Sequence, residues 1–127
     1  MKPLKALIVE DSELDEELLL RQLAKADYDV QSIRVQTAAD MEKALAEREW
    51  DIILSDYAMP GFTGLDALRV LKESGRDIPL IIISGTIGED VAVEAMRVGV
   101  DDYLIKGNLT RLAPAIEREI EFETLKF

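Results

Sequence analysis

Residues 52–56, IILSD, join three branched aliphatic side chains to a serine and an aspartate. Three other apolar runs also stop at polar side chains: residues 6–9 (ALIV) at Glu10-Asp11, residues 80–83 (LIII) at Ser84-Gly85, and residues 103–105 (YLI) at Lys106. Apolar runs with little alternation are typical of parallel strands that helices cover on both faces. If these runs are strands of one parallel sheet, their polar ends meet at one edge and form one site.

The segments between these runs have the spacing of amphipathic helices. Strand-like runs begin near residues 5, 30, 52, 79 and 102, and apolar residues recur at helical spacing after each of them. Four of these helical segments begin with a Ser/Thr-x-x-Asp/Glu capping pattern, namely Ser12 with Asp15, Thr37 with Asp40, Thr63 with Asp66, and Thr86 with Glu89. Gly75 and Gly99 follow two of the helices, where glycine favours a left-handed cap. The pattern predicts a single α/β domain of the form (βα)5.

The second strand-like run differs from the others because residues 30–37 (VQSIRVQT) alternate apolar and polar side chains. This alternation is typical of a strand at the edge of a sheet. Together with right-handed crossovers, it predicts a doubly wound, flavodoxin-like parallel sheet with strand order 2-1-3-4-5. The ligand crevice of such a sheet lies between the ends of the first and third strands. Glu10, Asp11 and Asp56 are expected there.

Composition narrows the classes of function. The 127 residues carry a net charge of -11 and have a pI near 4.4, which argues against a nucleic-acid surface. The sequence contains no cysteine and no histidine, so thiol and imidazole chemistry are excluded for this chain. Its apolar runs are much shorter than the roughly 20 residues of a membrane span, and we expect a cytosolic protein with no membrane partner.

The residue types at the strand ends suggest a particular chemistry. Carboxylates such as Glu10, Asp11 and Asp56 are the ligands that Mg²⁺ prefers, and a carboxylate can also act as a nucleophile toward phosphorus. Lys106 and the Ser84 hydroxyl can then neutralise or hydrogen-bond the oxygens of the transferred group. Polar strand caps without chemistry are the plainer interpretation, but they do not explain this combination of residue types.

Three segments resemble the receiver domain of response regulators in two-component signalling: LIVEDS (7–12), ILSDYAMPGFTGLDAL (53–68) and IIISGTIGEDVAVEAMRVGVDDYLIKG (81–107). The resemblance extends from about residue 4 to residue 120, and residues 119–127 are expected to begin a connecting helix. It implies roles for the following residues: Asp56 as phospho-acceptor, Glu10 and Asp11 as the acidic pair that binds Mg²⁺ with Asp56, the main-chain carbonyl of Ala58 as a further metal ligand, Lys106 as the phosphate-binding lysine, and Ser84 and Tyr103 as switch residues.

The resemblance also implies partners and a way of working. Asp56 would accept its phosphoryl group from a sensor histidine kinase or a histidine phosphotransfer protein, because this chain has no histidine of its own. The domain would catalyse only its own phosphorylation and dephosphorylation. An exposed Tyr103 would rotate inward as Ser84 moves toward the phosphoryl group. This change would alter the surface of the fourth helix, fifth strand and fifth helix, which an output domain or a second copy would contact.

Two departures from the family pattern stand out. Gly107 follows Lys106 where receivers usually have proline, which predicts a more mobile loop, and Thr63 stands where an acid is common. The acids that open the first helix, Glu13 and Asp15–Glu17, are interpreted as a solvated face that favours the helix dipole.

Three other functions are weighed against a receiver. A pseudo-receiver that binds partners without phosphate would not need the acid, serine and lysine set. A flavodoxin-like flavin carrier would need a Ser/Thr/Gly-rich phosphate loop after the first strand, where residues 10–13 read EDSE. A haloacid-dehalogenase-type phosphatase would need a DxD nucleophile motif at that same position, which EDSE does not supply.

Overall fold

The computed structural model describes residues 1–85 and 88–125, and for residue 89 and residues 122–125 it describes the backbone alone. Within these ranges strands and helices alternate in the following order: β1 (Lys2–Val9), α1 (Glu13–Lys25), β2 (Tyr28–Val35), α2 (Ala38–Glu47), β3 (Ile52–Asp56), α3 (Gly64–Ser74), β4 (Leu80–Ser84), α4 (Glu89–Val98), β5 (Asp102–Ile105), the 3₁₀-helix η1 (Leu109–Arg111) and α5 (Leu112–Leu125). The predicted (βα)5 pattern is confirmed, and η1 is an addition to it.

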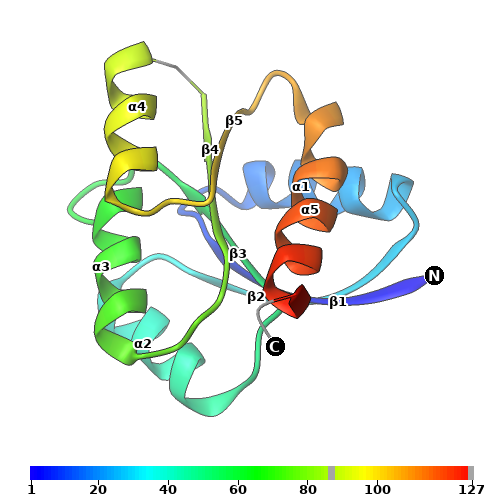
Figure 1. The fold of residues 1–127 in the computed structure, drawn as a ribbon, viewed down its shortest axis with the longest axis horizontal. Helices are drawn as coiled ribbons and strands as arrows, with labels where there is room; N and C mark the ends of the chain where they lie inside the picture. The colour runs from blue at the N-terminus through cyan, green and yellow to red at the C-terminus, as the bar shows by residue number, and fades with distance from the viewer. Residues whose placement is uncertain (86–87, 126–127) are drawn as a thin grey trace.

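The strands form one parallel sheet in the order β2-β1-β3-β4-β5 (Figure 1). This is the predicted order, with β2 at an edge. β1 and β2 begin earlier than their apolar patterns predict, because the two strands pair from Lys2 opposite Tyr28 to Val9 opposite Val35. The long pairing anchors the first strand, which carries Glu10 at its end.

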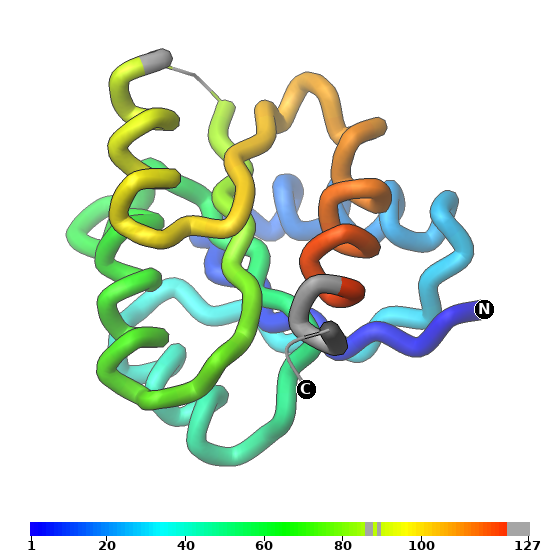
Figure 2. The backbone as a smooth tube through the Cα atoms, viewed as in Figure 1, coloured from blue at the N-terminus to red at the C-terminus, as the bar shows by residue number. Residues whose placement is uncertain are grey.

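The register brings the carboxyl ends of the inner strands level with one another. Val9 lies opposite Ser55, Asp56 lies opposite Ile83, and Ser84 lies opposite Ile105. The residue after each of these strand ends therefore reaches the same edge of the sheet. Figure 2 shows the end of β4 and the loop after β5 on the same side of the molecule.

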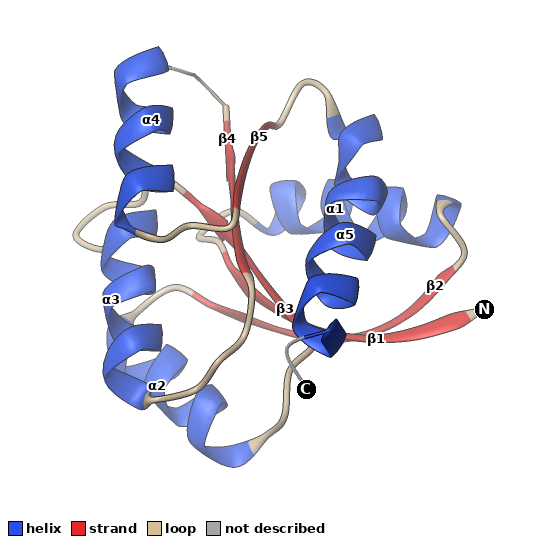
Figure 3. Ribbon diagram, viewed as in Figure 1, coloured by secondary structure: helices blue, strands red, loops and turns tan. Residues whose placement is uncertain are grey.

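Helices cover both faces of the sheet, with α1 and α5 on one face and α2, α3 and α4 on the other (Figure 3). Because side chains alternate along a strand, neighbouring residues enter different layers of the core. In β1, Leu7 and Val9 pack with the α2–α4 layer, whereas Ala6 and Ile8 pack with the α1–α5 layer. This double coverage explains why the inner strands are continuous apolar runs. No helix in the described part of the chain is long and apolar enough to cross a membrane.

Most of the predicted helix caps are present. The side chains of Ser12, Thr37 and Thr63 accept hydrogen bonds from the backbone three residues later, and Thr63 with Asp66 forms a complete capping box. The C-cap glycines Gly75 and Gly99 are left-handed as expected. The predicted start of the fourth helix is wrong: Gly88 is the N-cap of α4 and gives no side-chain cap, while Thr86 lies outside the described residues.

The loop after Asp56 packs so closely on the site that it requires a glycine at position 64. The Gly64 amide donates to the Tyr57 carbonyl at 2.9 Å. A Cβ atom at position 64 would lie 2.9 Å from the main-chain oxygen of Asp56 and 3.1 Å from Cδ1 of Ile82. The first contact is shorter than Cβ atoms tolerate, and it is to backbone that cannot move without shifting Asp56. The second is tight and would require the Ile82 side chain to move by a few tenths of an ångström.

We therefore expect Gly64→Ala to destabilise the protein by about 1–3 kcal/mol, the usual cost of forcing an atom into a packed site. Chemical denaturation would measure the change in the free energy of unfolding. Gly107→Ala is the matched control, because a Cβ atom there meets nothing within 4 Å. Its effect should stay within about 0.5 kcal/mol of wild type. Equal stability of the two variants would contradict the close packing at Gly64.

Candidate functional site

The residues that the sequence places at strand ends meet at the carboxyl edge of the sheet. Glu10 directly follows β1, Asp56 ends β3, Ser84 ends β4, and Lys106 directly follows β5. The Lys106 amide donates to the Ser84 carbonyl at 2.8 Å, which ties the ends of β4 and β5 together. The two acidic strand ends lie on neighbouring strands, at the point where the order of the sheet reverses.

Glu10, Asp11 and Asp56 form a tight acidic cluster. One carboxylate oxygen of each lies within 4.8 Å of the others. Glu10 and Asp56 are buried, with 1% and 8% of their surface exposed, whereas Asp11 is exposed. Carboxylates this close repel one another when ionised. A bound divalent cation would relieve this repulsion, and oxygen donors of this kind suit a hard cation such as Mg²⁺.

Glu10 is held in place from several directions. Its amide donates to the Val35 carbonyl at 2.9 Å, and its own carbonyl accepts a hydrogen bond from Arg34 at 3.2 Å. Its Oε1 accepts the Ser12 amide at 3.1 Å, and its Oε2 lies 3.0 Å from Lys106 Nζ. Burial raises the pKa of the Glu10 carboxyl from 4.5 to about 7, against the opposing effect of its hydrogen bond to Lys106. Sequence reasoning did not identify Arg34, whose partner at Glu10 is a backbone oxygen.

Lys106 brings a single positive charge to several acids. Its Nζ lies 2.6 Å from Asp15 Oδ2, 3.0 Å from Glu10 Oε2 and 3.4 Å from Asp56 Oδ2. Burial alone would lower the pKa of Lys106, but the hydrogen bonds to Asp15 and Glu10 outweigh burial and raise this pKa above its ordinary value. The lysine therefore stays protonated and partly offsets the charge of the cluster. The greater mobility expected from Gly107 stays a prediction.

The sequence predicts that Asp15 lies on a solvated face of α1, but its carboxylate instead pairs with Lys106. It lies in the first turn of α1, and its carboxylate makes the shortest of the three contacts of Lys106. Its side chain is 31% exposed. The reason is topological: η1, which follows β5, packs against α1, and this packing brings residue 106 next to residue 15. Nothing in the local sequence around Asp15 indicates this contact.

Tyr103 lies inside the protein, whereas the sequence analysis expected an exposed phenol before activation. It is 8% exposed and packs in the layer with α2–α4. Its hydroxyl is buried and has no hydrogen-bond partner among the described residues. The Tyr103 ring lies 6.4 Å from the ring of Tyr57, the residue that follows Asp56. Tyr57, which the sequence analysis left without a role, links the acidic cluster to β5.

The other predicted residues keep positions compatible with their predicted roles. Ser84 is buried at the end of β4. Ala58 is exposed in the loop two residues after Asp56, and its role as a main-chain metal ligand stays a prediction. A Cβ atom at Gly85 would lie 3.9 Å from Cδ of Lys106, so the backbone there passes close to the lysine.

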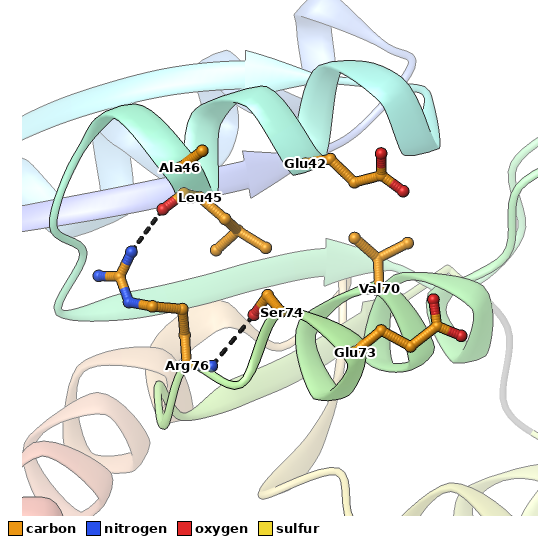
Figure 4. Close-up of a pocket in the computed structure, with 7 residues that line it drawn as sticks. All are labelled: Glu42, Leu45, Ala46, Val70, Glu73, Ser74 and Arg76. Atoms are coloured by element: carbon orange, nitrogen blue, oxygen red, sulfur yellow. Dashed lines mark hydrogen bonds between the residues drawn. The ribbon is translucent and has the colours of Figure 1, made fainter.

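A surface pocket of about 530 Å³ lies apart from this cluster, between α2 and α3 (Figure 4). Leu45 and Val70 form its apolar part, and Glu42 and Glu73 lie at its rim. Arg76 donates to the carbonyl of Leu45 and so caps the end of α2. None of the strand-end residues lines this pocket, and its arginine is engaged in holding the two helices together.

Comparison with known proteins identifies the class that the fold and the acidic cluster define. The profile of the response regulator receiver domain matches residues 6–117. The chain therefore belongs to the receiver domain family, the signalling domains of response regulators in two-component systems.

Individual relatives agree with this assignment. LuxO of Vibrio cholerae serotype O1 is 37% identical over 99 residues, which are 78% of this chain and 21% of that regulator. The chain thus spans about a fifth of the length of this relative. The receiver domain of a putative LuxO repressor from Vibrio parahaemolyticus superposes with a TM-score of 0.84 at 24% identity, covering 99% of this chain and 95% of that one.

A further structure is the receiver domain of a sensor histidine kinase from Pseudomonas aeruginosa, which has a magnesium ion coordinated in its active site cleft. Its TM-score is 0.76 at 24% identity, and the match covers 94% of this chain and 98% of that one. At this identity the likeness establishes the shared fold.

The raised pKa of Glu10 predicts a pH-dependent stability in metal-free buffer. Because the pKa of Glu10 is higher in the folded state than in the unfolded state, the folded state binds the proton more tightly. The free energy of unfolding of the wild type therefore decreases as the pH rises from about 4.5 through 7. Glu10→Gln removes the titration. We expect the stability of this variant relative to wild type to rise by about 2 kcal/mol between pH 5 and pH 8.

Urea denaturation with a chelator at both pH values would measure this difference. Glu13→Gln is the control, because its side chain is 86% exposed and pairs only loosely with Arg34. A pH-independent difference between Glu10→Gln and wild type would show that the buried carboxyl is not destabilised by its surroundings.

Proposed function

We propose that this chain is a phosphorylation-controlled switch in which Asp56 accepts a phosphoryl group with Mg²⁺ bound beside it. The observation that carries the proposal is the arrangement around Asp56. Two further carboxylates lie within 4.8 Å of it, and the ammonium of Lys106 lies 3.4 Å from its Oδ2. Charge of both signs is thus concentrated where a phosphoryl group would be transferred.

The donor set fits Mg²⁺. Glu10, Asp11 and Asp56 each offer a carboxylate oxygen within 4.8 Å of the others, and the Ala58 carbonyl is proposed as a fourth ligand. Two or three carboxylates are enough for this ion, because it usually keeps several waters. The receiver domain from Pseudomonas aeruginosa with magnesium in its cleft supports this assignment. A bound Mg²⁺ would neutralise charge on the phosphoryl oxygens during transfer.

The protein groups have complementary roles in the transfer. An oxygen of the Asp56 carboxylate attacks phosphorus, the new O–P bond forms, and the P–N bond of the donor phosphohistidine breaks. The imidazole leaves with the electron pair of that bond. Lys106 remains charged and pairs with an oxygen of the phosphoryl group. Transfer to the Asp56 carboxylate, which forms an acyl phosphate, needs little more than alignment and charge neutralisation, and a buried strand end and a lysine held beside it would supply both.

The partner that donates the phosphoryl group is a sensor histidine kinase or a histidine phosphotransfer protein, since the chain itself has no histidine. The domain acts in catalysis only on its own aspartate. We place it in the cytosol, where such donors are found. Residues 119–125, which were expected to begin a connecting helix, form the last part of α5 (Leu112–Leu125), and residues 126–127 lie outside the described part.

Readout passes from Asp56 to the surface of α4, β5 and α5. The phosphoryl oxygens are new acceptors, and the Ser84 hydroxyl moves toward them. Tyr103 lies on β5, the strand that pairs with β4 and Ser84, and its side chain is packed inward. A movement of Ser84 would therefore reach Tyr103 through the end of β4 and through its ring contact with Tyr57. Val93, Met96 and Ile105 are exposed on this surface, where an output domain or a second copy would bind.

A phosphate-independent interaction module is the alternative. The site does not favour it, because the three acids, the serine and the lysine are all present and adjacent. A module that no longer used phosphate would have no reason to keep two buried acids close enough to repel each other.

Asp56→Asn is expected to abolish phosphorylation by acetyl phosphate in the presence of Mg²⁺, because the amide is not a nucleophile toward phosphorus. Intact-mass measurement should show one added phosphoryl group on wild type, lost with a chelator and absent in the variant. Asp66→Asn is the control, since Asp66 caps α3 and does not belong to the cluster. A phosphoryl group that persists on Asp56→Asn would assign the acceptor elsewhere.

Beryllofluoride with Mg²⁺ is expected to shift backbone amide resonances well beyond the cluster, in residues 88–105 as well as around Asp56. The reason is that β4 and β5 pair directly at Ser84 and Ile105, so movement at one strand end displaces the other. Two-dimensional NMR spectra with and without the analogue would measure this response. Changes confined to Glu10, Asp11, Asp56 and Lys106 would contradict a readout through α4 and β5.

A further inference from the structure

Asp15 is the partner closest to Lys106. Its Oδ2 lies 2.6 Å from Nζ, compared with 3.0 Å for Glu10 and 3.4 Å for Asp56. An ammonium group has three N–H donors, and three carboxylates surround this one. In the unphosphorylated domain, the lysine therefore makes its shortest contact to an acid outside the acidic cluster.

The start of α1 explains why the Asp15 side chain is available for this contact. The Asp15 amide donates to the Ser12 hydroxyl at 3.2 Å, which is one half of a capping box. The other half would use the Asp15 carboxylate to accept the Ser12 amide, but that amide donates to Glu10 Oε1 at 3.1 Å. The Asp15 carboxylate instead reaches across to Lys106. Among the described residues, no other cation pairs with it.

We propose that Asp15 is a positioning residue that holds Lys106 in the unphosphorylated domain and competes with the phosphoryl group for its charge. This inference rests on the proposed function, since it assumes that Lys106 pairs with a phosphoryl group on Asp56. Asp15 does not touch the reacting atoms, because it acts through the lysine.

The charges decide the direction of the effect. A cation bound at Glu10, Asp11 and Asp56 would neutralise the charge of those three acids. The charge of Asp15, which is not a ligand of the cation, would then be balanced by Lys106 alone. A phosphoryl group then attracts the lysine against the pull of Asp15, and its oxygens are also repelled by the Asp15 carboxylate. Without a phosphoryl group, Asp15 has the opposite effect on Mg²⁺, because it draws Lys106 away from Glu10 and Asp56. Asp15 therefore favours the cation and disfavours the phosphoryl group.

Asp15→Asn separates these two effects. We expect it to bind beryllofluoride, at saturating Mg²⁺, about two- to fivefold more tightly than wild type, the range typical of a partly exposed ion pair. Its affinity for Mg²⁺ alone should be lower than that of wild type. Titration calorimetry would measure Mg²⁺ binding, and NMR titration would measure binding of the analogue.

Glu13→Gln is the matched control, because it removes the same charge from the same helical turn but its partner is Arg34, at 3.4 Å. It should leave both affinities close to wild type. A purely structural role for Asp15 would weaken both kinds of binding in Asp15→Asn, and that result would overturn the inference. Equal changes in Asp15→Asn and Glu13→Gln would also overturn it, since they would reflect net charge alone.

Binding of beryllofluoride to the wild-type protein distinguishes a failure of the role of Asp15 from a failure of the proposed function. If wild type binds beryllofluoride with Mg²⁺ and Asp15→Asn binds it with unchanged affinity, the proposed function stands and the role of Asp15 is overturned. If wild type itself does not bind the analogue, the proposed function fails, and the competition for Lys106 fails with it.

Discussion

The parallel register of the sheet is the constraint on which the rest of the structure depends. Because every strand runs in the same direction, each apolar run ends at the same edge of the sheet, where the polar residues that follow the inner strands come together. The pairing of Val9 with Ser55 and of Ser84 with Ile105 sets these ends level. A slip of one residue in any inner strand would turn its side chains to the opposite face and remove its polar end from the site. The same strand register is therefore needed both to pack the core and to assemble the site.

Electrostatics in this crevice oppose stability. Glu10 and Asp56 are buried beside each other, and Lys106 contacts these two acids and Asp15, while Asp11 adds a further carboxylate to the cluster. Removing charged groups from water is costly, and one ammonium cannot offset all of them. Under the proposed function, a bound cation would neutralise this excess charge and so allow an anionic group to approach Asp56. The residues of the cluster are therefore better suited to binding ligands than to stabilising the fold.

The fold and the strand-end residues could be predicted from the sequence because both depend on local patterns. The apolar run of residues 80–83 and the capping pair Thr63 and Asp66 indicate the strand and the helix start that they form. The sheet order was predicted from the alternating edge strand together with right-handed crossovers and the analogy with other doubly wound sheets. Contacts between distant segments could not be predicted in this way. The pairing of Asp15 with Lys106 depends on how η1, which follows β5, packs against α1. Tyr103 is buried in the α2–α4 layer, which is assembled from segments distant in the sequence. The start of α4 was misplaced because Thr86 and Glu89 have the spacing of a cap, whereas the helix begins after Gly88.

The position of Tyr103 limits how the proposed switch could work. Its ring already occupies the interior, so activation cannot consist only of filling an empty space beside Ser84. Its hydroxyl is buried, and no hydrogen-bond partner for it lies within the described residues. Under the proposed function, activation would therefore act on the packing of Tyr103 against Tyr57 and the α2–α4 layer, rather than on a ring that moves in from the surface.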